Sequence, residues 1–472
     1  MDVGREKSVF LEGGIFLSVI DKTIRTEFLH YIEENKILLY HFAEKSGINS
    51  GTLSRVINGS QPISVKILDI MTEYMGLEEG YFYEQYVSEL FDDFTMNWRR
   101  LRPFITRCAE LGKNDCIERT VDLMMENPSY IKPLFDCAES FNAEGSAAAA
   151  LIIYRKVCEG ERYQHAERLA ICQYRIFKLS INDDQQNNLE CAVQFDPYVV
   201  RLNELDQLDA LKDLMNLYLS LRRWDKAEQL ATRMGKLARV QYKIKQQRIR
   251  RGKSYQEPSK PLFGYILYSD LIIASIYGEK NEYQQALYYV SCYENHEWII
   301  ENDLEAELTK SQFREWATAN RYLFEIMAGR IEILDEYVDY LSTKENEILR
   351  GLFKLIKAAL NYNMNMDHVL ERFKTTISSF MITHEKVGSY TNQIIDDQFV
   401  NFLADVADYY LNSDRIRVGI QFILDSLAIS ARINNDACMV RGFCTFDSIR
   451  HLATNEELHK YTTLLKEVRK ER

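Results

Sequence analysis

The stretch Phe42–Ser64, FAEKSGINSGTLSRVINGSQPIS, decides how the N-terminal part of the chain folds. Gly47 separates two short amphipathic segments, which predicts two helices joined by a tight turn, because glycine tolerates the backbone conformation that ends a helix. Asn49 stands where a helix N-cap belongs, directly before a predicted helix at Ser50–Ile57. Asn58 and Gly59 then end this helix.

Helical periodicity continues on both sides of this stretch. Apolar residues recur at helical spacing over Ile24–Asn35, and we expect further helices at Leu38–Lys45 and at Val65–Met75, where Gly76 ends the last one. We expect a small residue, Ala43, to let two helices cross closely. The apolar side chains expected to fill the small core are Ile48, Leu53 and Val56.

This segment resembles the XRE (Cro/repressor-type) helix-turn-helix family. The positions that carry the resemblance are Phe42, Ala43, Gly47, Ile48, Thr52, Leu53, Ser54, Arg55, Val56, Asn58 and Gly59. In that family the second helix of the motif lies in the major groove of DNA. The resemblance implies base contacts from Ser50, Gly51, Ser54 and Arg55, and phosphate contacts from Asn49, Thr52, Asn58 and Ser60. Arg55 is the strongest candidate, because a guanidinium group can donate to both acceptors of a guanine.

Two features depart from the family pattern. Leu39 stands where the first helix of the motif often begins with a polar, phosphate-contacting residue, and the segment Ile24–Gly80 holds five basic residues against eight acidic ones. We therefore expect DNA affinity to depend on dimerisation or on basic groups elsewhere in the chain. The alternative is that the domain serves only for protein contacts.

From about Tyr81 onward, amphipathic helices follow one another, and four stretches share a pattern. Each has a small or aliphatic residue and an aromatic residue near the end of one helix, followed by small residues early in the next. The four copies are Ala138, Phe141, Gly145, Ala150 and Tyr154; Leu214, Tyr218, Trp224, Ala227 and Ala231; Ala274, Tyr277, Tyr283, Ala286 and Val290; and Ala407, Tyr410, Ile416, Gly419 and Ile423.

The pattern resembles the tetratricopeptide repeat, which implies about seven to nine stacked helix pairs. Such stacks have a concave inner surface suited to an extended peptide. Candidate peptide-binding residues are Asn216, Asn320 and Asn401, because a side-chain amide can both donate to and accept from a peptide backbone.

These features predict an all-α protein. We expect an N-terminal arm at 1–22, the helix-turn-helix domain at 23–80, a linker helix at 81–110, and a right-handed tetratricopeptide-like α-solenoid at 111–472 for sensing and dimerisation.

Two basic stretches stand out: Tyr242–Lys260, YKIKQQRIRRGKSYQEPSK, and the group Arg99, Arg100, Arg102 and Arg107. We expect the first stretch to be a helix end followed by a loop, which is either solvated or contacts a phosphate or a ligand carboxylate. We expect the second group to form a hinge or to contact phosphate.

Composition limits the classes of function. A net charge of −12 over 472 residues argues against indiscriminate nucleic-acid binding. Nine cysteines without a CxxC pair disfavour a zinc site and fit a reducing compartment. The N-terminus lacks the pattern of a signal peptide, and the most apolar run, Ala147–Tyr154, is too short to span a bilayer. We therefore expect a cytoplasmic protein with no metal, no cofactor and no membrane partner.

The chain contains no P-loop, GxSxG or HExxH motif, so we do not expect an enzyme. Its domain order resembles the RRNPP group of quorum-sensing regulators, including the arbitrium receptors of phages and related Bacillus and Paenibacillus regulators. That resemblance implies a homodimer whose helical body binds a short peptide pheromone and thereby changes the affinity for a double-stranded operator. Two alternatives stay open: a helical scaffold that sequesters another regulatory protein, and a phage-type repressor without a ligand.

Overall fold

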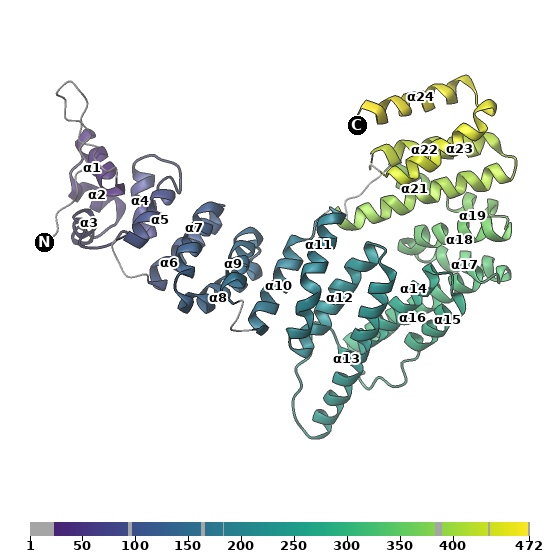
Figure 1. The fold of residues 1–472 in the computed structure, drawn as a ribbon, viewed down its shortest axis with the longest axis horizontal. Coiled ribbons are helices and arrows are strands. Elements are labelled where there is room, and N and C mark those ends of the chain that lie inside the picture. The colour runs from purple at the N-terminus through teal and green to yellow at the C-terminus, as the bar shows by residue number, and fades with distance from the viewer. Residues whose placement is uncertain are drawn as a thin grey trace. The chain divides into compact units, whose positions relative to one another are not determined.

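The computed structural model describes residues 23–92, 97–161, 166–182, 184–382, 389–432 and 435–470 (Figure 1). Over these ranges the chain consists of α-helices and short 3-10 helices and contains no strand, which confirms the predicted all-α class. The predicted N-terminal arm at 1–22 lies outside the described residues. None of the described helices combines the length and the apolar character needed to cross a membrane.

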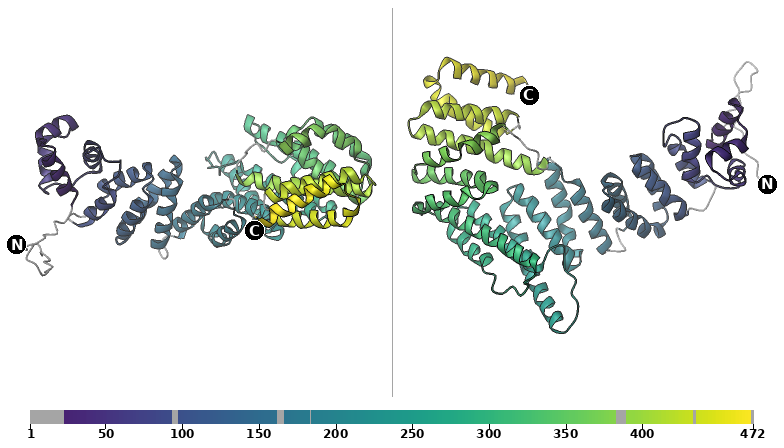
Figure 2. Two further views of the ribbon diagram at one scale, coloured as in Figure 1. Left: turned by 90° about the horizontal axis from the view of Figure 1, so that it is seen from above. Right: turned by 180° about the vertical axis from the view of Figure 1, so that it is seen from behind.

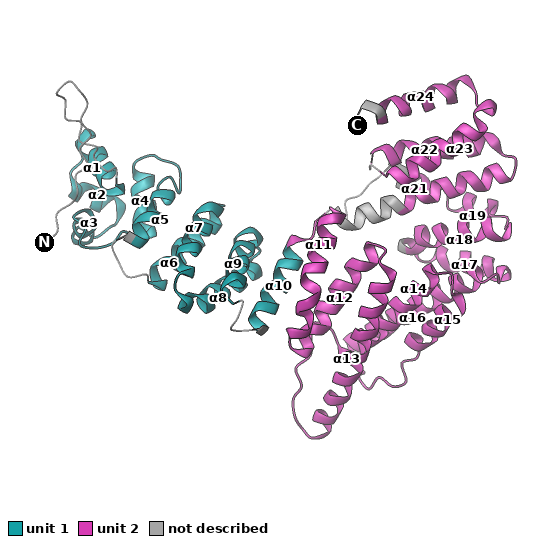
Figure 3. Cartoon of the chain, in the orientation of Figure 1, with its two compact units in different colours: residues 1–179 teal, residues 180–472 magenta. Residues whose placement is uncertain are grey.

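The chain divides into two compact units after Leu179, with unit 1 covering residues 1–179 and unit 2 residues 180–472 (Figure 3). Unit 1 opens with α1 (Ile24–Glu34), α2 (Leu39–Ser46), α3 (Ser50–Ile57) and α4 (Val65–Tyr74). The four helices predicted in this region are thereby confirmed, with bounds that differ by at most one residue. The core between them is built from side chains that include Phe28, Phe42, Ile48, Leu53 and Met71.

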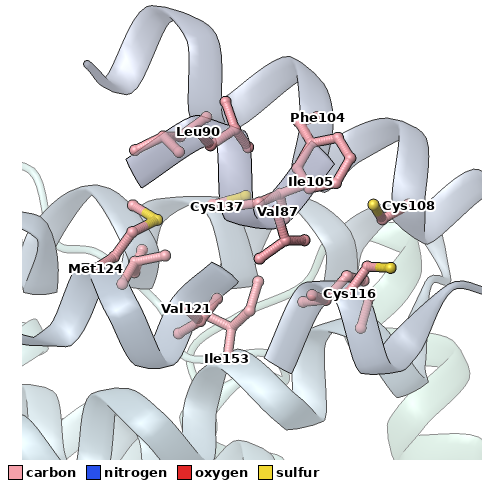
Figure 4. Close-up of a cluster of buried hydrophobic side chains, with 14 of the residues drawn as sticks. Val87, Leu90, Phe104, Ile105, Cys108, Cys116, Val121, Met124, Cys137 and Ile153 are labelled. Atoms are coloured by element: carbon pink, nitrogen blue, oxygen red, sulfur yellow. The ribbon is translucent and has the colours of Figure 1, made fainter. Parts of the chain in front are cut away.

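The rest of unit 1 consists of α5 (Tyr83–Asp92), α6 (Trp98–Glu110), α7 (Asn114–Met125), α8 (Ile131–Glu144), α9 (Ala147–Gly160) and α10 (Ala166–Ser180). The stretch 81–110, predicted as a linker helix, therefore contains two helices. Both belong to a buried core, which Figure 4 shows around Val87, Phe104, Cys108, Cys116 and Val121. Five of the nine cysteines are buried, and burial raises the pKa of the Cys137 thiol to about 11, so that this thiol stays neutral near neutral pH.

Helix α5 is fastened to the first four helices. The Tyr86 hydroxyl donates to the carbonyl of Ile63 at 2.6 Å, and the Tyr83 hydroxyl donates to Asp69 at 2.6 Å. The buried core around α5 also includes Val56 from the end of α3. Helices α1–α4 are therefore one part of a larger packed body in unit 1.

Unit 2 contains fourteen α-helices among its described residues. They are α11 (Gln185–Phe195), α12 (Glu204–Ser220), α13 (Trp224–Arg250), α14 (Leu262–Glu279), α15 (Tyr283–Glu294), α16 (Leu304–Met327), α17 (Leu334–Ser342), α18 (Ile348–Tyr362), α19 (Asp367–Arg372), α20 (Lys374–Ile382), α21 (Ser389–Asn412), α22 (Ile416–Arg432), α23 (Asp436–Ile449) and α24 (Asn455–Lys470). Each helix from α12 to α16 packs chiefly on its neighbours in chain order, as do α21, α22 and α23 (Figure 2).

The four sequence copies form four helix pairs, α8–α9, α12–α13, α14–α15 and α21–α22, and the turns between them share one geometry. In each turn the carbonyl of the aromatic residue accepts a hydrogen bond from the backbone N–H five residues later, at 2.8–3.0 Å. The residue four positions after the aromatic has a positive φ, the left-handed conformation of a helix C-terminal cap. These residues are Gly145 (85°), Arg222 (54°), Asn281 (62°) and Asp414 (57°).

The small residues of the pattern lie where paired helices approach each other. Ala150, Ala227 and Ala286 are fully buried, and each is the fourth residue of its helix. Gly419 holds the same position in α22, where an added Cβ would come within 2.6 Å of the Leu411 side chain. These small residues therefore let the second helix of each pair lie close to the first.

Arg222 provides a test of the shared turn, because an L-residue with a side chain is strained at a φ of 54° whereas glycine is not. Arg222→Gly is expected to raise the free energy of unfolding of unit 2 by about 0.5–1 kcal/mol after the larger backbone entropy of glycine is subtracted. Trp224, Trp298 and Trp316 are three of the chain's four tryptophans, so tryptophan fluorescence during urea unfolding follows unit 2.

Arg222→Ala serves as the matched control. It removes the same exposed side chain but keeps the Cβ, and it should leave the unfolding midpoint close to that of the unmodified chain. Equal midpoints for the glycine and alanine variants would show that the turn is not strained.

Candidate nucleic-acid interface

The turn between α2 and α3 sets the direction of α3. Gly47 ends α2 with a φ of 69°, as expected from the sequence. No atom lies within 4 Å of the position that its Cβ would occupy, so the backbone conformation and not the available space requires glycine here. Phe42 and Ala43 bury one face of α2, which fixes that helix against the core.

One face of α3 is buried and the other is open. Leu53 is 2% exposed and Val56 is fully buried, so these residues anchor the helix. All four residues predicted to contact bases, Ser50, Gly51, Ser54 and Arg55, are exposed. The structure therefore brings the predicted base-contacting residues together on the solvent-facing side of one eight-residue helix.

Asn49 caps the first turn of α3, as the sequence predicts. Its Oδ1 accepts hydrogen bonds from the backbone N–H groups of Gly51 at 3.0 Å and of Thr52 at 3.2 Å. The free N–H groups and the dipole of a helix N-terminus favour an anion nearby. Asn49 itself is exposed, and its acceptor oxygen is engaged by the helix that it caps.

The remaining predicted phosphate contacts lie at the end of α3 and along its side. Asn58 and Ser60 are exposed, and the Oδ1 of Asn58 accepts from the backbone N–H of Ser60 at 3.0 Å and from its hydroxyl at 2.6 Å. Thr52 is half-buried, and its hydroxyl accepts from Arg55 at 3.3 Å. These side chains are bound to one another before any partner arrives, which fixes the shape of the turn after α3.

The charge around α3 differs from the charge of the whole domain. The 22 residues from Lys45 to Lys66 contain no aspartate or glutamate, and their three charged side chains, Lys45, Arg55 and Lys66, are all basic and exposed. A charge count over the entire segment Ile24–Gly80 hides this local excess of basic residues. A count over a shorter stretch of sequence reveals it. The stretch of sequence that contains α3 therefore carries only positive charges, although the domain as a whole is acidic.

Arg25, one of the five basic residues of this domain, has a structural role. Its Nε donates to the carbonyl of Val56 at 2.9 Å, and its Nη1 forms an ion pair with Glu89 at 3.1 Å. The side chain is 17% exposed. Arg25 thus ties α1 to the end of α3 and to α5.

The start of α2 is apolar as well as uncapped. No side chain caps this helix, and Leu38, Leu39 and Tyr40 expose 38–59% of their surface. The departure from the family pattern that the sequence shows at Leu39 is therefore confirmed: α2 begins with an exposed apolar side chain. Leu38 and Leu39 offer no donor, so a phosphate contact at this helix end would come from backbone N–H groups or from the exposed Tyr40 hydroxyl.

Arg107 of the basic group on α6 is occupied by carboxylates. It forms ion pairs with Asp69 at 3.1 Å, Glu79 at 2.8 Å and Glu110 at 2.9 Å. Hydrogen bonds to these carboxylates, above all Glu110, raise the pKa of the Arg107 guanidinium above its usual range. Arg107 therefore joins α4 to α6 along an open cleft of about 470 Å³ that Lys66 and Arg102 also line. The Arg107 side chain therefore has a structural role within unit 1 and is not free to contact phosphate.

The predicted peptide-binding asparagines lie on three helices of unit 2. Asn216 on α12 accepts from the Tyr268 hydroxyl at 2.8 Å, and Asn320 on α16 donates to the Tyr293 hydroxyl at 2.9 Å. Asn401 is half-buried on α21. Asn216 and Asn320 therefore connect neighbouring helices, and neither is a freely exposed amide.

The cap on α3 can be tested by substitution. Asn49→Ala removes the side-chain acceptor of the cap and should lower the free energy of unfolding by about 1 kcal/mol. The Thr52 N–H keeps a second acceptor, the Asn49 carbonyl at 3.0 Å, so the change is felt mainly at Gly51. Hydrogen exchange at the amide of Gly51 should become faster. Asn49→Asp keeps an acceptor and should retain slow exchange, so equal exchange rates in both variants would contradict the assigned cap.

Comparisons with known proteins add no assignment to this geometry: the chain matches no protein-family model, and no curated protein shows significant similarity to it. The functional interpretation of the α3 surface therefore depends on its own geometry and charge.

Proposed function

We propose that the chain is a sequence-specific DNA-binding transcriptional regulator in which α2 and α3 form a helix-turn-helix. The observation that carries this proposal is the exposed face of α3, with Ser50, Ser54 and Arg55, inside a 22-residue stretch without an acidic residue. In a chain of net charge −12, such a stretch is where a polyanion can approach.

The dimensions of α3 fit this role. An α-helix with its side chains is about 10–12 Å in diameter, and the major groove is about 12 Å wide, so α3 can lie in the groove. Gly51 keeps the first turn of α3 narrow, so that the helix N-terminus can come close to the DNA. Arg55 lies one turn further along and supplies the only guanidinium group of the stretch from Lys45 to Lys66.

The helices that follow are proposed to form a tetratricopeptide-like right-handed solenoid that binds a short signalling peptide. Two observations support this: the same turn recurs between helix pairs, and helices pack chiefly on their neighbours in chain order. A stack of this kind leaves an extended face for a peptide. We also propose that the protein is a cytoplasmic homodimer, because paired half-sites compensate for the weak contacts of one acidic domain.

The proposed role of Asn216 and Asn320 differs from the one expected from the sequence, because neither amide is free. Each amide is bonded to a tyrosine hydroxyl, so a peptide could engage it only beside that bond or in exchange for it. These asparagines would then couple peptide binding to the hydrogen bond between α12 and α14 and to the packing of α15 on α16.

The DNA-binding proposal is tested with the full chain and a pool of randomised duplexes. The protein should enrich a defined sequence, and Arg55→Ala should weaken binding to the enriched duplex by about 5- to 150-fold, which corresponds to the 1–3 kcal/mol of one bidentate base contact. Discrimination should be lost mainly at one base pair. Fluorescence anisotropy of the labelled duplex gives both quantities.

Lys132→Ala is the matched control, because Lys132 is an exposed basic residue of unit 1 that is paired with Asp136. It should bind the enriched duplex like the unmodified chain. Failure to enrich any sequence would reject the proposed function, and equally weakened binding in both variants would reject the role of Arg55.

The peptide proposal is tested with short peptides encoded by open reading frames next to the gene. One such peptide should change the affinity for the enriched duplex, with saturation at a defined peptide concentration measured by calorimetry. If none of them binds or changes DNA affinity, a repressor without a ligand or a scaffold for another protein explains the helical body better.

A further inference from the structure

The longest described helix, α13, carries an unusual charge pattern. Nine lysines and arginines lie between Arg233 and Lys253, and this segment contains no aspartate or glutamate. They are Arg233, Lys236, Arg239, Lys243, Lys245, Arg248, Arg250, Arg251 and Lys253. All but the last two belong to α13, and the proposed function of α3 makes no use of them.

Two of these cations hold α13 in unit 2. Arg239 donates to both oxygens of buried Asp270 on α14, at 3.0 and 2.7 Å. Lys245 is buried and pairs with Glu301 at 2.6 Å and with Glu257. The Tyr242 hydroxyl also donates to Glu301, at 2.7 Å. These bonds fix the direction in which the helix continues.

The basic residues beyond these anchors are not neutralised. Lys243, Arg248, Arg250, Arg251 and Lys253 are exposed, and none of the five forms an ion pair with any residue that the structure describes. They lie on the last turns of α13 and the start of the following loop, which project beyond the neighbouring helices of unit 2 (Figures 1 and 2). We name this projecting segment, residues 243–253, the α13 tip.

An uncompensated cluster of like charges repels itself and costs stability. Elsewhere on the chain, some exposed lysines have an acidic partner one helical turn away, such as Lys132 with Asp136 and Lys460 with Glu456. The α13 tip has glutamine and isoleucine in place of such acidic partners. The tip is therefore suited to a partner that supplies several negative charges at once.

The exposed apolar residues of this region decide between two polyanionic partners. Val240, Ile244 and Ile249 are 53%, 38% and 50% exposed. At 100° per residue, Ile249 lies about 140° around the helix from Ile244, so the three do not form one apolar face. A helix that inserts into a membrane surface needs such a face. A nucleic-acid backbone needs only cations, and arginine matches phosphate with two parallel hydrogen bonds.

We propose that the α13 tip is a second nucleic-acid contact, which binds the phosphate backbone without reading base sequence. Its recognition chemistry is that of free guanidinium and ammonium groups on a projecting helix end. The inference goes beyond the base contacts assigned to α3 and shares with the proposed function only the class of partner.

The test uses the full chain carrying Lys243→Gln, Arg248→Gln, Arg250→Gln and Arg251→Gln. Affinity for a labelled duplex of arbitrary sequence is measured by anisotropy between about 50 and 200 mM salt. The slope of log affinity against log salt should become shallower by about 0.9 for each phosphate that the variant no longer neutralises. Affinity at low salt should fall at least about 10-fold, since several cations are removed together.

The matched control carries Arg330→Gln, Arg350→Gln, Arg372→Gln and Lys460→Gln. These exposed residues of unit 2 are each paired with a carboxylate, so the control has the same net charge as the tip variant without touching the tip. It should keep the slope of the unmodified chain. Equal slopes for the two quadruple variants would overturn the proposal.

Further arms separate the remaining outcomes. The double variant Arg251→Gln and Lys253→Gln, which leaves Trp224–Arg250 intact, should weaken binding less but in the same direction even if the quadruple variant unfolds. If the tip variant no longer binds vesicles of anionic phospholipid but keeps duplex affinity, the tip is a membrane contact and the proposal is wrong. If tip substitutions weaken arbitrary-duplex binding while no sequence is ever enriched, the tip contact stands and the proposed function fails.

Discussion

A chain that reverses direction between two helices must satisfy the last carbonyl groups of the first helix within a few residues. In this protein one six-residue solution recurs: the carbonyl of an aromatic residue accepts from the N–H five positions later, and the residue before that N–H turns left-handed. The turn fixes where the second helix starts. As a consequence, the residue nine positions after the aromatic always faces the first helix, and at those positions the chain has Ala150, Ala227, Ala286 and Gly419.

This constraint makes the packing local. Because each turn aligns two successive helices, most contacts of α12–α16 join neighbours in the sequence, and a chain dominated by short-range contacts needs little loop-closure entropy to fold. The same turn appears between α6 and α7, where Lys113 donates to Cys108 at 2.8 Å and Gly112 has a φ of 66°. This pair is not among the four copies found in the sequence, since a cysteine replaces the aromatic residue.

Elements marked by local signals were predictable. Gly47, Asn49 and the pair Asn58–Gly59 act through their own backbone conformation or caps, so the bounds of α2 and α3 could be predicted without knowledge of the fold. The exposed face of α3 followed from those bounds. The chain thus contained enough local information to place the candidate site on one helix.

Roles that depend on distant partners were not predictable. Arg25 pairs with Glu89, which lies 64 positions away, and Asn216 bonds to Tyr268, which lies 52 positions away. A single sequence gives the type of such a residue but not what the fold brings against it. The stretch 81–110 is a similar case, because only packing shows that α5 and α6 are part of a core and not a connection.

Helix α3 contributes side chains to two hydrophobic cores. Leu53 packs among α1, α2 and α4, whereas Val56, one turn later, packs in the cluster that contains Tyr83, Tyr86 and Phe104. The side chains of α3 thus connect the core of the first four helices to the core that α5 and α6 share. A rearrangement of α5 or α6 that displaces this second core therefore acts directly on the end of α3. The same geometry means that a fragment cut at residue 80 would leave Ile24, Val56, Ile63 and Leu68 without the packing partners that α5 and the following helices supply.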